Sequence, residues 1–349
     1  MSILASHDSW VDFFKNLRYV VVDELHSYRG IFGAHFAAVI ARLKRIAAHY
    51  GASPQFITSS ATIANPGEFA EKLFDEPCRV VDKSGAPAAG RHYLFINPGD
   101  ISPATMASRL LPNFMEMGLK TIAFTKSRRN TELIYNWISH GNKELESRIS
   151  SYRSGYLPEE RREIEKRLAD DSLDAVISTS ALELGIDIGG LDACILVGYP
   201  GTVSSTLQRG GRVGRGERDS LVALIAQADA LDQYFMRNPD DFFSRGPESA
   251  ILDPDNEYIQ AQHLICAAAE IPIEKGEKLI DSERKAKVLE ELRSTGRLLE
   301  DMKGEKLFSS RDKPHRSVSL REAGESFSII DTSGVKAAVI GSIGGSRAM

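Results

Sequence analysis

Two adjacent carboxylates follow a continuous apolar run near the start of the sequence. The run Tyr19-Val20-Val21-Val22 leads directly into Asp23 and Glu24. A run without polar alternation is typical of a strand buried on both faces of a parallel sheet, and open α/β sheets bind their ligands at the carboxyl ends of such strands. A carboxylate there can hold Mg²⁺ beside nucleotide phosphates, and its neighbour can polarise a water molecule. From these residues alone, a strand followed by a solvated acidic turn is an equally good interpretation.

Arg212 and Arg215 form a second candidate pair. They are three residues apart, so on a helix they would share one face and reach the same ligand. Two arginines at this spacing ordinarily indicate a solvated basic face. The adjacent Gly211 and Gly214 permit a close backbone approach, which favours a role facing a ligand.

The elements that must position these groups alternate along the chain. Apolar residues at helical spacing predict a helix over residues 33–50, and Asn65 before Pro66 predicts a capped helix that reaches about residue 74. The small residues 83–90 indicate a linker. Strands are predicted at 55–59, 79–81, 120–125, 174–179, 191–197 and 220–225. Helices are predicted over 158–168 and 283–293, and two more are predicted to begin at Ser102-Pro103 and at Ser127, which caps its helix. This alternation predicts a parallel α/β sheet, and the changed texture after residue 229 predicts helices and a small winged-helix-like unit.

Composition narrows the class of protein. The 349 residues are enough for two or three domains, and no apolar run approaches the roughly 20 residues that a membrane span requires. The three cysteines are far apart, which indicates a reducing, cytoplasmic setting without a zinc site. The net charge of −5 excludes a globally basic nucleic-acid binder, so any such binding must use local patches.

Four motifs in a fixed order carry a family resemblance. They are Asp23-Glu24-Leu25-His26, Ser60-Ala61-Thr62, the segment 178–187 and the segment 208–215. Together they resemble the second to sixth motifs of superfamily 2 DEAD/DEAH-like helicases. Further segments (23–36, 231–239 and 255–270) are similar to the MrfA/YprA-type, RecQ-like DNA helicases, to which the Lhr helicases are related more distantly.

This resemblance implies a fold and a division into domains. The fold would be tandem RecA-like domains, the first one partial, followed by a partial, mostly helical and winged-helix-like domain. The implied bounds are 1–82 for the first RecA-like domain, 83–90 for the linker, 91–228 for the second and 229–349 for the last. The implied activity is ATP-dependent 3′→5′ translocation on DNA, with a role in DNA repair.

The resemblance also implies roles for individual residues, with ATP and Mg²⁺ as cofactors. Asp23 would hold the Mg²⁺ ion, Glu24 would orient the attacking water, and Arg212 and Arg215 would act as arginine fingers. The remaining motif residues would belong to the nucleotide relay (His26, Asp187, Gln208) or to the coupling of the domains (Ser60, Thr62). For His26 alone, a capped loop histidine is the competing interpretation.

Candidate nucleic-acid contacts follow three predicted strands. Phosphate oxygens can meet side chains and backbone amides where such strands end, and three sites along one sheet edge would track a DNA backbone with little sequence preference. These candidates are Lys126, Arg128, Arg153, Ser178, Thr179 and Ser180. The mixed charges of residues 159–167 instead indicate a salt-bridged, solvated helix.

The sequence departs from the family pattern at one decisive point. No Gly-x-x-x-x-Gly-Lys-Ser/Thr loop is present, and the dipeptide Gly-Lys does not occur. We therefore expect an internal fragment of a longer helicase, inactive alone unless another chain supplies the loop. A non-catalytic nucleic-acid-binding module and an RNA helicase or remodeller of the same superfamily are the alternatives. The intact Asp-Glu pair argues against the first alternative, and the segments after residue 231 argue against the second.

Overall fold

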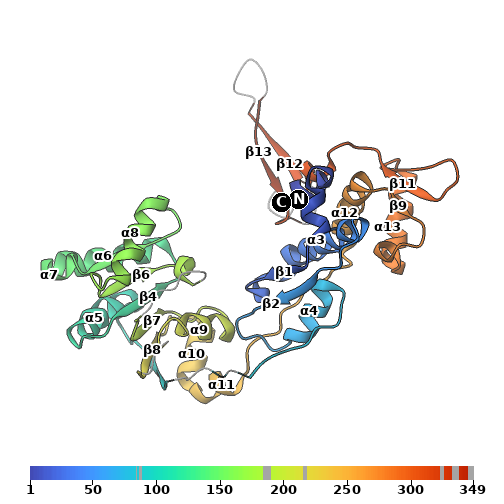
Figure 1. Cartoon of the computed structure of the whole chain (residues 1–349). Helices are drawn as coiled ribbons and strands as arrows, with labels where there is room; N and C mark the ends of the chain where they lie inside the picture. The colour runs from blue at the N-terminus through green and yellow to red at the C-terminus, as the bar shows by residue number, and fades with distance from the viewer. Residues whose placement is uncertain are drawn as a thin grey trace. The chain divides into compact units, whose positions relative to one another are not determined.

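The computed structural model describes residues 1–83, 85, 89–183, 190–214, 218–322, 326–331 and 338–344 (Figure 1). The chain forms two compact units. One, here named the central unit, is continuous and comprises Asp82–Glu248. The other, the terminal unit, is built from both ends of the chain, Met1–Val81 and Ser249–Met349.

A parallel sheet forms the centre of the central unit. Its described strands lie in the order β3 (Arg91–Ile96), β8 (Ser220–Ile225), β7 (Ala193–Val197), β4 (Thr121–Thr125), β6 (Ala175–Ser178) and β5 (Ile149–Tyr152). All neighbouring strands pair in parallel. Every residue of β4, β6 and β7 is buried, as expected for apolar runs covered on both faces. The four strands predicted in this region are confirmed.

Helices cover both faces of this sheet. The two faces hold separate cores, one around Phe124 and the other around Ala123, because successive strand residues point to opposite sides. Ser102 and Ser127 cap α5 and α6 with their side chains, as predicted. The helices of this unit are α5 (Pro103–Glu116), α6 (Arg128–Gly141), α7 (Lys143–Glu146), α8 (Pro158–Ala169), α9 (Val203–Gly210), α10 (Ala230–Arg237) and α11 (Pro239–Ser244).

The central unit extends beyond residue 228, where the sequence placed the end of the second domain. Phe235 of α10 and Phe242 of α11 are both buried in the core that contains Phe124. The compact unit therefore ends at Glu248. The change from strand-like to helical sequence after residue 229 marks the last strand of the sheet. It does not mark the end of the core, because the helices that follow also contribute buried side chains to it.

The first part of the terminal unit is a parallel strand pair with helices on one face. β1 (Tyr19–Val22) pairs with β2 (Gln55–Thr58), and α3 (Gly30–His49) and α4 (Pro66–Phe74) pack against them. Tyr19, Val21 and Ile57 on the opposite face are 61%, 69% and 46% exposed. The prediction that β1 is buried on both faces is wrong for this structure, since no element of the described residues covers that second face.

The second part of the terminal unit has the predicted winged-helix-like character. α12 (Glu257–Glu270) and α13 (Glu283–Ser294) pack on a small antiparallel sheet in the order β10 (Leu298–Glu300), β11 (Lys306–Ser309) and β9 (Ile273–Glu274). α12 also lies against α3 of the first part (Figure 1). The remaining described elements are α1 (Ser2–Ala5), η1 (His7–Trp10), α2 (Val11–Lys15), η2 (Leu25–Ser27), η3 (Ser180–Leu182), η4 (Lys278–Ile280), η5 (Pro314–Ser317), β12 (Ser326–Asp331) and β13 (Ala338–Gly344).

Two local predictions are wrong. Residues 79–81 do not form a strand. The Asn65 side chain does not cap α4, because its amide group exchanges two hydrogen bonds with the backbone of Ala250, at 2.8 and 3.0 Å. Asn65 therefore ties the start of α4 to the segment that leads into the winged-helix-like part. Within the described residues, no helix is long and apolar enough to cross a membrane.

Candidate functional site

The end of β1 holds the Asp23 carboxylate in a defined orientation. Asp23 Oδ1 accepts a hydrogen bond from the backbone N–H of Glu24 at 2.8 Å and another from the Ser59 hydroxyl. These hydrogen bonds, the Ser59 one first, lower the pKa of Asp23 below its ordinary value. Asp23 is also exposed. It is thus an ionised oxygen ligand that is free to meet a cation.

Ser59 is a site residue that the sequence did not reveal. Ser59 directly follows β2, the strand next to β1. Its backbone N–H donates to Val22 O at 3.2 Å, and its carbonyl accepts from Leu25 N at 2.9 Å. The available signal was its place in the sequence, directly before Ser60-Ala61-Thr62 and one residue past a strand that pairs with β1. Only the register of β1 against β2 shows that its hydroxyl reaches Asp23.

Glu24 and His26 form a small relay in the turn after β1. Glu24 adopts a left-handed backbone conformation (φ 54°), which a non-glycine residue takes only at a cost. Nδ1 of His26 lies 3.4 Å from Glu24 Oε2 and 3.2 Å from the backbone N of Ala61. Ala61 N–H can only donate and the carboxylate can only accept, so Nδ1 satisfies one of them at a time. His26 therefore links the Asp-Glu motif to the Ser-Ala-Thr motif within the terminal unit.

Ser60 and Thr62, the predicted coupling residues, lie on either side of Ala61. The Ser60 hydroxyl donates to the Ala61 carbonyl at 2.7 Å. Ser60 and Thr62 are both exposed. Their side chains are therefore available to a partner outside the described contacts of this loop.

The arginine motif of the central unit has a different geometry from the one expected. α9 ends at Gly210, so Arg212 lies in the turn beyond it and not on a helix. Two successive glycines at the helix end explain this early stop. Arg212 is buried and donates to the backbone carbonyl of Glu183. Gln208 lies half-buried on α9. Asp187 and Arg215 lie outside the described residues.

Arg209, another residue without a predicted role, anchors this motif. Its Nη2 and Nε lie 2.9 and 3.1 Å from Glu183 Oε2, and its guanidinium stands 5.4 Å from the ring centre of Phe124. Glu183 thus accepts from Arg209 through its carboxylate and from Arg212 through its carbonyl. The arginine motif and the segment 180–183 are therefore held together as one group.

The predicted nucleic-acid contacts do gather at one edge of the central sheet. β4, β6 and β5 are neighbours in that order and parallel, so the residues that follow them share the carboxyl edge. Arg128 Nη2 reaches the Ser154 hydroxyl, 3.4 Å away, across this edge. Ser178 is fully buried, whereas Thr179 is half-buried and Ser180 exposed. The Thr179 and Ser180 side chains can therefore contact a DNA strand directly, whereas the buried Ser178 side chain cannot do so in this conformation.

The two other cations at this edge have acidic neighbours. Lys126 Nζ lies 3.4 Å from Asp229 and 3.8 Å from Asp232. Arg153 Nε lies 3.1 Å from Glu132, over the ring of Tyr156. The Lys126–Asp229 and Arg153–Glu132 pairs are exposed or half-exposed and contribute about 0–1 kcal/mol each, so a phosphate group can replace Asp229 or Glu132 at little cost, whereas Asp232 is buried.

Two α/β units, a carboxylate pair at a strand end in one and an arginine motif after a helix in the other are the arrangement expected of the helicase class of proteins. Three family models agree with this. They are "DEAD/DEAH box helicase" over residues 1–69, "Helicase conserved C-terminal domain" over 105–217 and "ATP-dependent helicase HRQ1, winged helix domain" over 252–323. The chain belongs to the superfamily 2 helicases, in the group that contains YprA, Hrq1 and MrfA. The predicted tandem RecA-like and winged-helix-like architecture is confirmed.

Individual relatives give the extent of the match. The ATP-dependent helicase YprA of Bacillus subtilis is 43% identical over 346 residues, which are 96% of this chain and 46% of YprA. The ATP-dependent helicase hrq1 of Schizosaccharomyces pombe is 37% identical over 289 residues, 78% of this chain and 27% of hrq1. Crystal structures of the helicase MrfA match with TM-scores of 0.85 (bound to DNA, 41% identical) and 0.87 (bound to DNA and AMPPNP, 42% identical). They cover 99% of this chain and 48% and 50% of MrfA, so the chain spans about half the length of YprA and MrfA.

Proposed function

We propose that this chain forms motor parts of an ATP-dependent DNA helicase that moves 3′→5′ along DNA and serves in DNA repair. The observation that carries the proposal is the Asp23-Glu24 pair at the carboxyl end of β1, with Asp23 oriented by Ser59. The relatives supply further support, because YprA and hrq1 are named ATP-dependent helicases and MrfA has been crystallised with DNA and with AMPPNP. The well-separated free cysteines fit a cytoplasmic setting.

The chemistry of the site follows from the state of its residues. Asp23 would hold Mg²⁺, and it fits that role because its carboxylate is exposed and its pKa is lowered. The ion would supply charge neutralisation at the phosphate oxygens. Glu24 would orient the attacking water. Arg212 and Arg215 would offset the negative charge that spreads over the transferred group.

The sequence contains no phosphate-binding loop of the Gly-x-x-x-x-Gly-Lys-Ser/Thr type. No Gly-Lys dipeptide occurs in the sequence, so the chain has no lysine in the position that holds the β- and γ-phosphates. We propose that the chain alone hydrolyses ATP at the background rate. A segment with a Gly-x-x-x-x-Gly-Lys-Ser/Thr loop, in the same polypeptide or in a partner chain, would complete the site.

DNA would bind along the carboxyl edge of β4, β6 and β5. The cations Lys126, Arg128 and Arg153 and the hydroxyls of Thr179 and Ser180 offer contacts to phosphates. Binding of this kind is independent of base sequence and depends strongly on salt.

A strand-displacement assay tests the proposed direction and substrate. The protein would be this chain fused to a segment that carries a Gly-x-x-x-x-Gly-Lys-Ser/Thr loop. Duplexes with a 3′ single-stranded DNA tail should be unwound in an ATP-dependent reaction, and duplexes with a 5′ tail should not. Unwinding of RNA duplexes alone would favour an RNA helicase, and binding without ATP-dependent unwinding would favour a binding module.

A further inference from the structure

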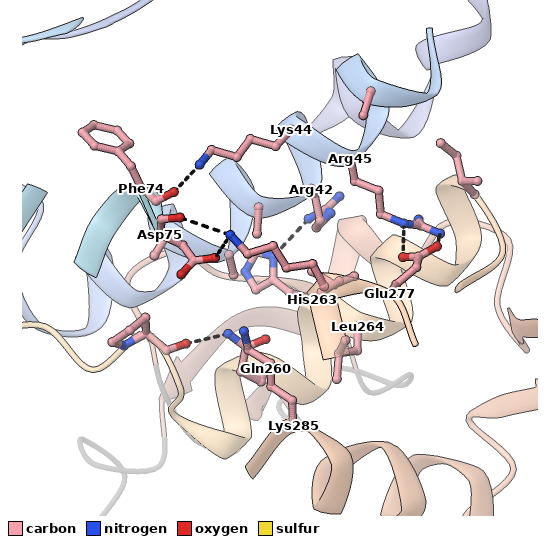
Figure 2. A pocket seen from close by; sticks show the side chains of 18 of the residues that line it. Arg42, Lys44, Arg45, Phe74, Asp75, Gln260, His263, Leu264, Glu277 and Lys285 are labelled. Carbon is pink, nitrogen blue, oxygen red and sulfur yellow. Dashed lines mark hydrogen bonds and ion pairs between the residues drawn. The ribbon is translucent and has the colours of Figure 1, made fainter. Parts of the chain in front are cut away.

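A pocket of about 570 Å³ lies inside the terminal unit, away from the motif residues. One wall comes from α3 and the end of α4, and the other comes from α12, β9 and η4 (Figure 2). Pockets of about 300–1,000 Å³ are typical of small-molecule sites. The residues that line this one include none of the predicted nucleotide or nucleic-acid contacts.

The shape of the pocket suits an apolar body. Ala37, Ala38 and Ala41 present only methyl groups from α3, while Leu264 of α12 and Leu279 of η4 line the opposite side. The small side chains leave space that larger ones would fill. An aromatic or aliphatic group placed here would therefore contact apolar surface from both parts of the terminal unit.

Ion pairs hold the two walls at a fixed separation. Arg42 of α3 pairs with Glu270 of α12, where both side chains are almost fully buried and Arg42 Nε lies 3.0 Å from Glu270 Oε2. Arg45 Nε lies 2.8 Å from Glu277 Oε2, and Lys278 Nζ lies 2.9 Å from Asp75 Oδ2 at the end of α4 (Figure 2). These three pairs cross from one wall to the other. The buried Arg42–Glu270 pair and the largely buried Arg45–Glu277 pair hold the two walls together, whereas the exposed Lys278–Asp75 pair adds little.

Two lysines of the pocket can exchange their acidic partners for a ligand anion. The lining contains six lysine or arginine side chains, and each of them forms an ion pair with an aspartate or glutamate. Lys72 and Lys285 are the two whose pairs neither cross the pocket nor use an acid of its lining. Lys72 pairs with Glu68 one turn earlier on an exposed helix surface, and Lys285 Nζ is 3.5 Å from Asp255. The Lys72–Glu68 side chains are 51% and 60% exposed, and an exposed pair of this kind contributes only about 0.2–1 kcal/mol, whereas the longer Lys285–Asp255 pair is half-buried.

We propose that this pocket binds a small amphipathic anion, with a flat apolar body between α3 and α12 and a carboxylate, sulfonate or phosphate group at Lys285 or Lys72. Figure 2 shows Lys285 and Gln260 on the same side of the pocket, opposite the α3 cations. A ligand in this position contacts both the first part of the terminal unit and its winged-helix-like part. Binding therefore stabilises the junction between them.

The first test compares two probes that differ only in charge. 2-Naphthoate carries the anionic group, and 2-naphthylmethanol has the same ring system without it. Calorimetric titration of the purified chain should give one saturable site for 2-naphthoate, with an affinity about tenfold above that for the alcohol, as expected for one charge-assisted hydrogen bond. Equal affinities, or no saturable binding of either probe, would overturn the proposal.

Variants place the probe in the pocket. Ala41→Phe places a large side chain in the pocket and should abolish binding of 2-naphthoate. Ala286→Phe is the control, because it makes the same change at an exposed position on α13 outside the pocket lining and should leave binding unchanged. Lys285→Glu, which reverses the charge at the proposed anion contact, should weaken binding about tenfold or more. Binding that survives Ala41→Phe and Lys285→Glu but is lost in Val21→Ser would assign the probe to the exposed face of β1 and refute the site.

Discussion

The buried ion pair between Arg42 and Glu270 gives the sharpest stability prediction. The two side chains are 1% and 2% exposed, and Arg42 also donates from Nη1 to His263 Nδ1 at 3.0 Å. Removing one partner leaves an uncompensated charge in the interior, so Arg42→Met or Glu270→Gln should each cost about 3–5 kcal/mol of unfolding free energy. Because two apolar side chains of similar volume need no compensation, the double variant Arg42→Met/Glu270→Met should recover most of that loss.

The chain has two tryptophans, one in each unit, which makes the measurement clean. Trp10 reports on the terminal unit in a Trp137→Phe background, and Trp137 reports on the central unit in a Trp10→Phe background. With a urea slope of about 2 kcal/mol/M, each single variant should lower the midpoint of the terminal unit by roughly 1.5–2.5 M. The midpoint of the central unit should stay in place. Single variants that cost less than about 1 kcal/mol, or a double variant as unstable as the sum of the singles, would refute the reasoning.

Three further predictions address pH, DNA and the arginine motif. Burial lowers the pKa of His35 and, with the nearby charge of Arg42, holds the pKa of His263 well below 6.5, so both are neutral in the folded chain. The unfolded chain then binds more protons, so the stability of the terminal unit should fall as the pH drops below 6.5. The loss, read from Trp10 fluorescence, should be at most about 1.4 kcal/mol per pH unit for each histidine. A urea midpoint that stays unchanged between pH 7.5 and 5 would contradict this. The affinity of the chain for single-stranded DNA should fall with salt, and a plot of log affinity against log salt concentration should have a slope of about −0.7 per neutralised phosphate. Lys126→Ala should reduce the slope by about one such phosphate, and Arg162→Ala on the solvated face of α8 should leave it unchanged. A slope near zero would exclude ionic contacts. In the fusion that supplies the phosphate-binding loop, Arg212→Ala should lower ATP turnover at least ~10³-fold with DNA affinity retained; lost DNA binding with retained turnover would instead assign Arg212 to the DNA groove.

The sequence predicted the central unit well because local signals there agree with tertiary structure. Ser102 and Ser127 cap the helices that they were predicted to cap, and the predicted strand at 220–225 is β8 with the same bounds. Apolar runs, caps and short loops all lie within a few residues of one another. Such signals need no knowledge of which strand lies next to which.

The features that escaped prediction depend on residues far apart in the chain. Ser59 aligns Asp23 only because β2 pairs with β1 in one register, and Asn65 leaves its helix to bond Ala250 across 185 residues. His263 donates from Nε2 to His35 Nδ1 at 3.0 Å, because Arg42 donates to its other nitrogen. Single-sequence patterns contain no information on such pairings.

The central claim is that Asp23 and Glu24 form the hydrolytic half of an ATPase whose phosphate-binding loop lies outside this sequence. The most direct measurement is DNA-stimulated phosphate release by the fusion of this chain to a segment that carries the phosphate-binding loop, with and without Glu24→Gln. We predict stimulated turnover for the parent fusion, a loss of at least ~10³-fold in Glu24→Gln with DNA binding retained, and background rates for the chain alone. Turnover that persists in Glu24→Gln, or robust turnover by the chain alone, would contradict the account.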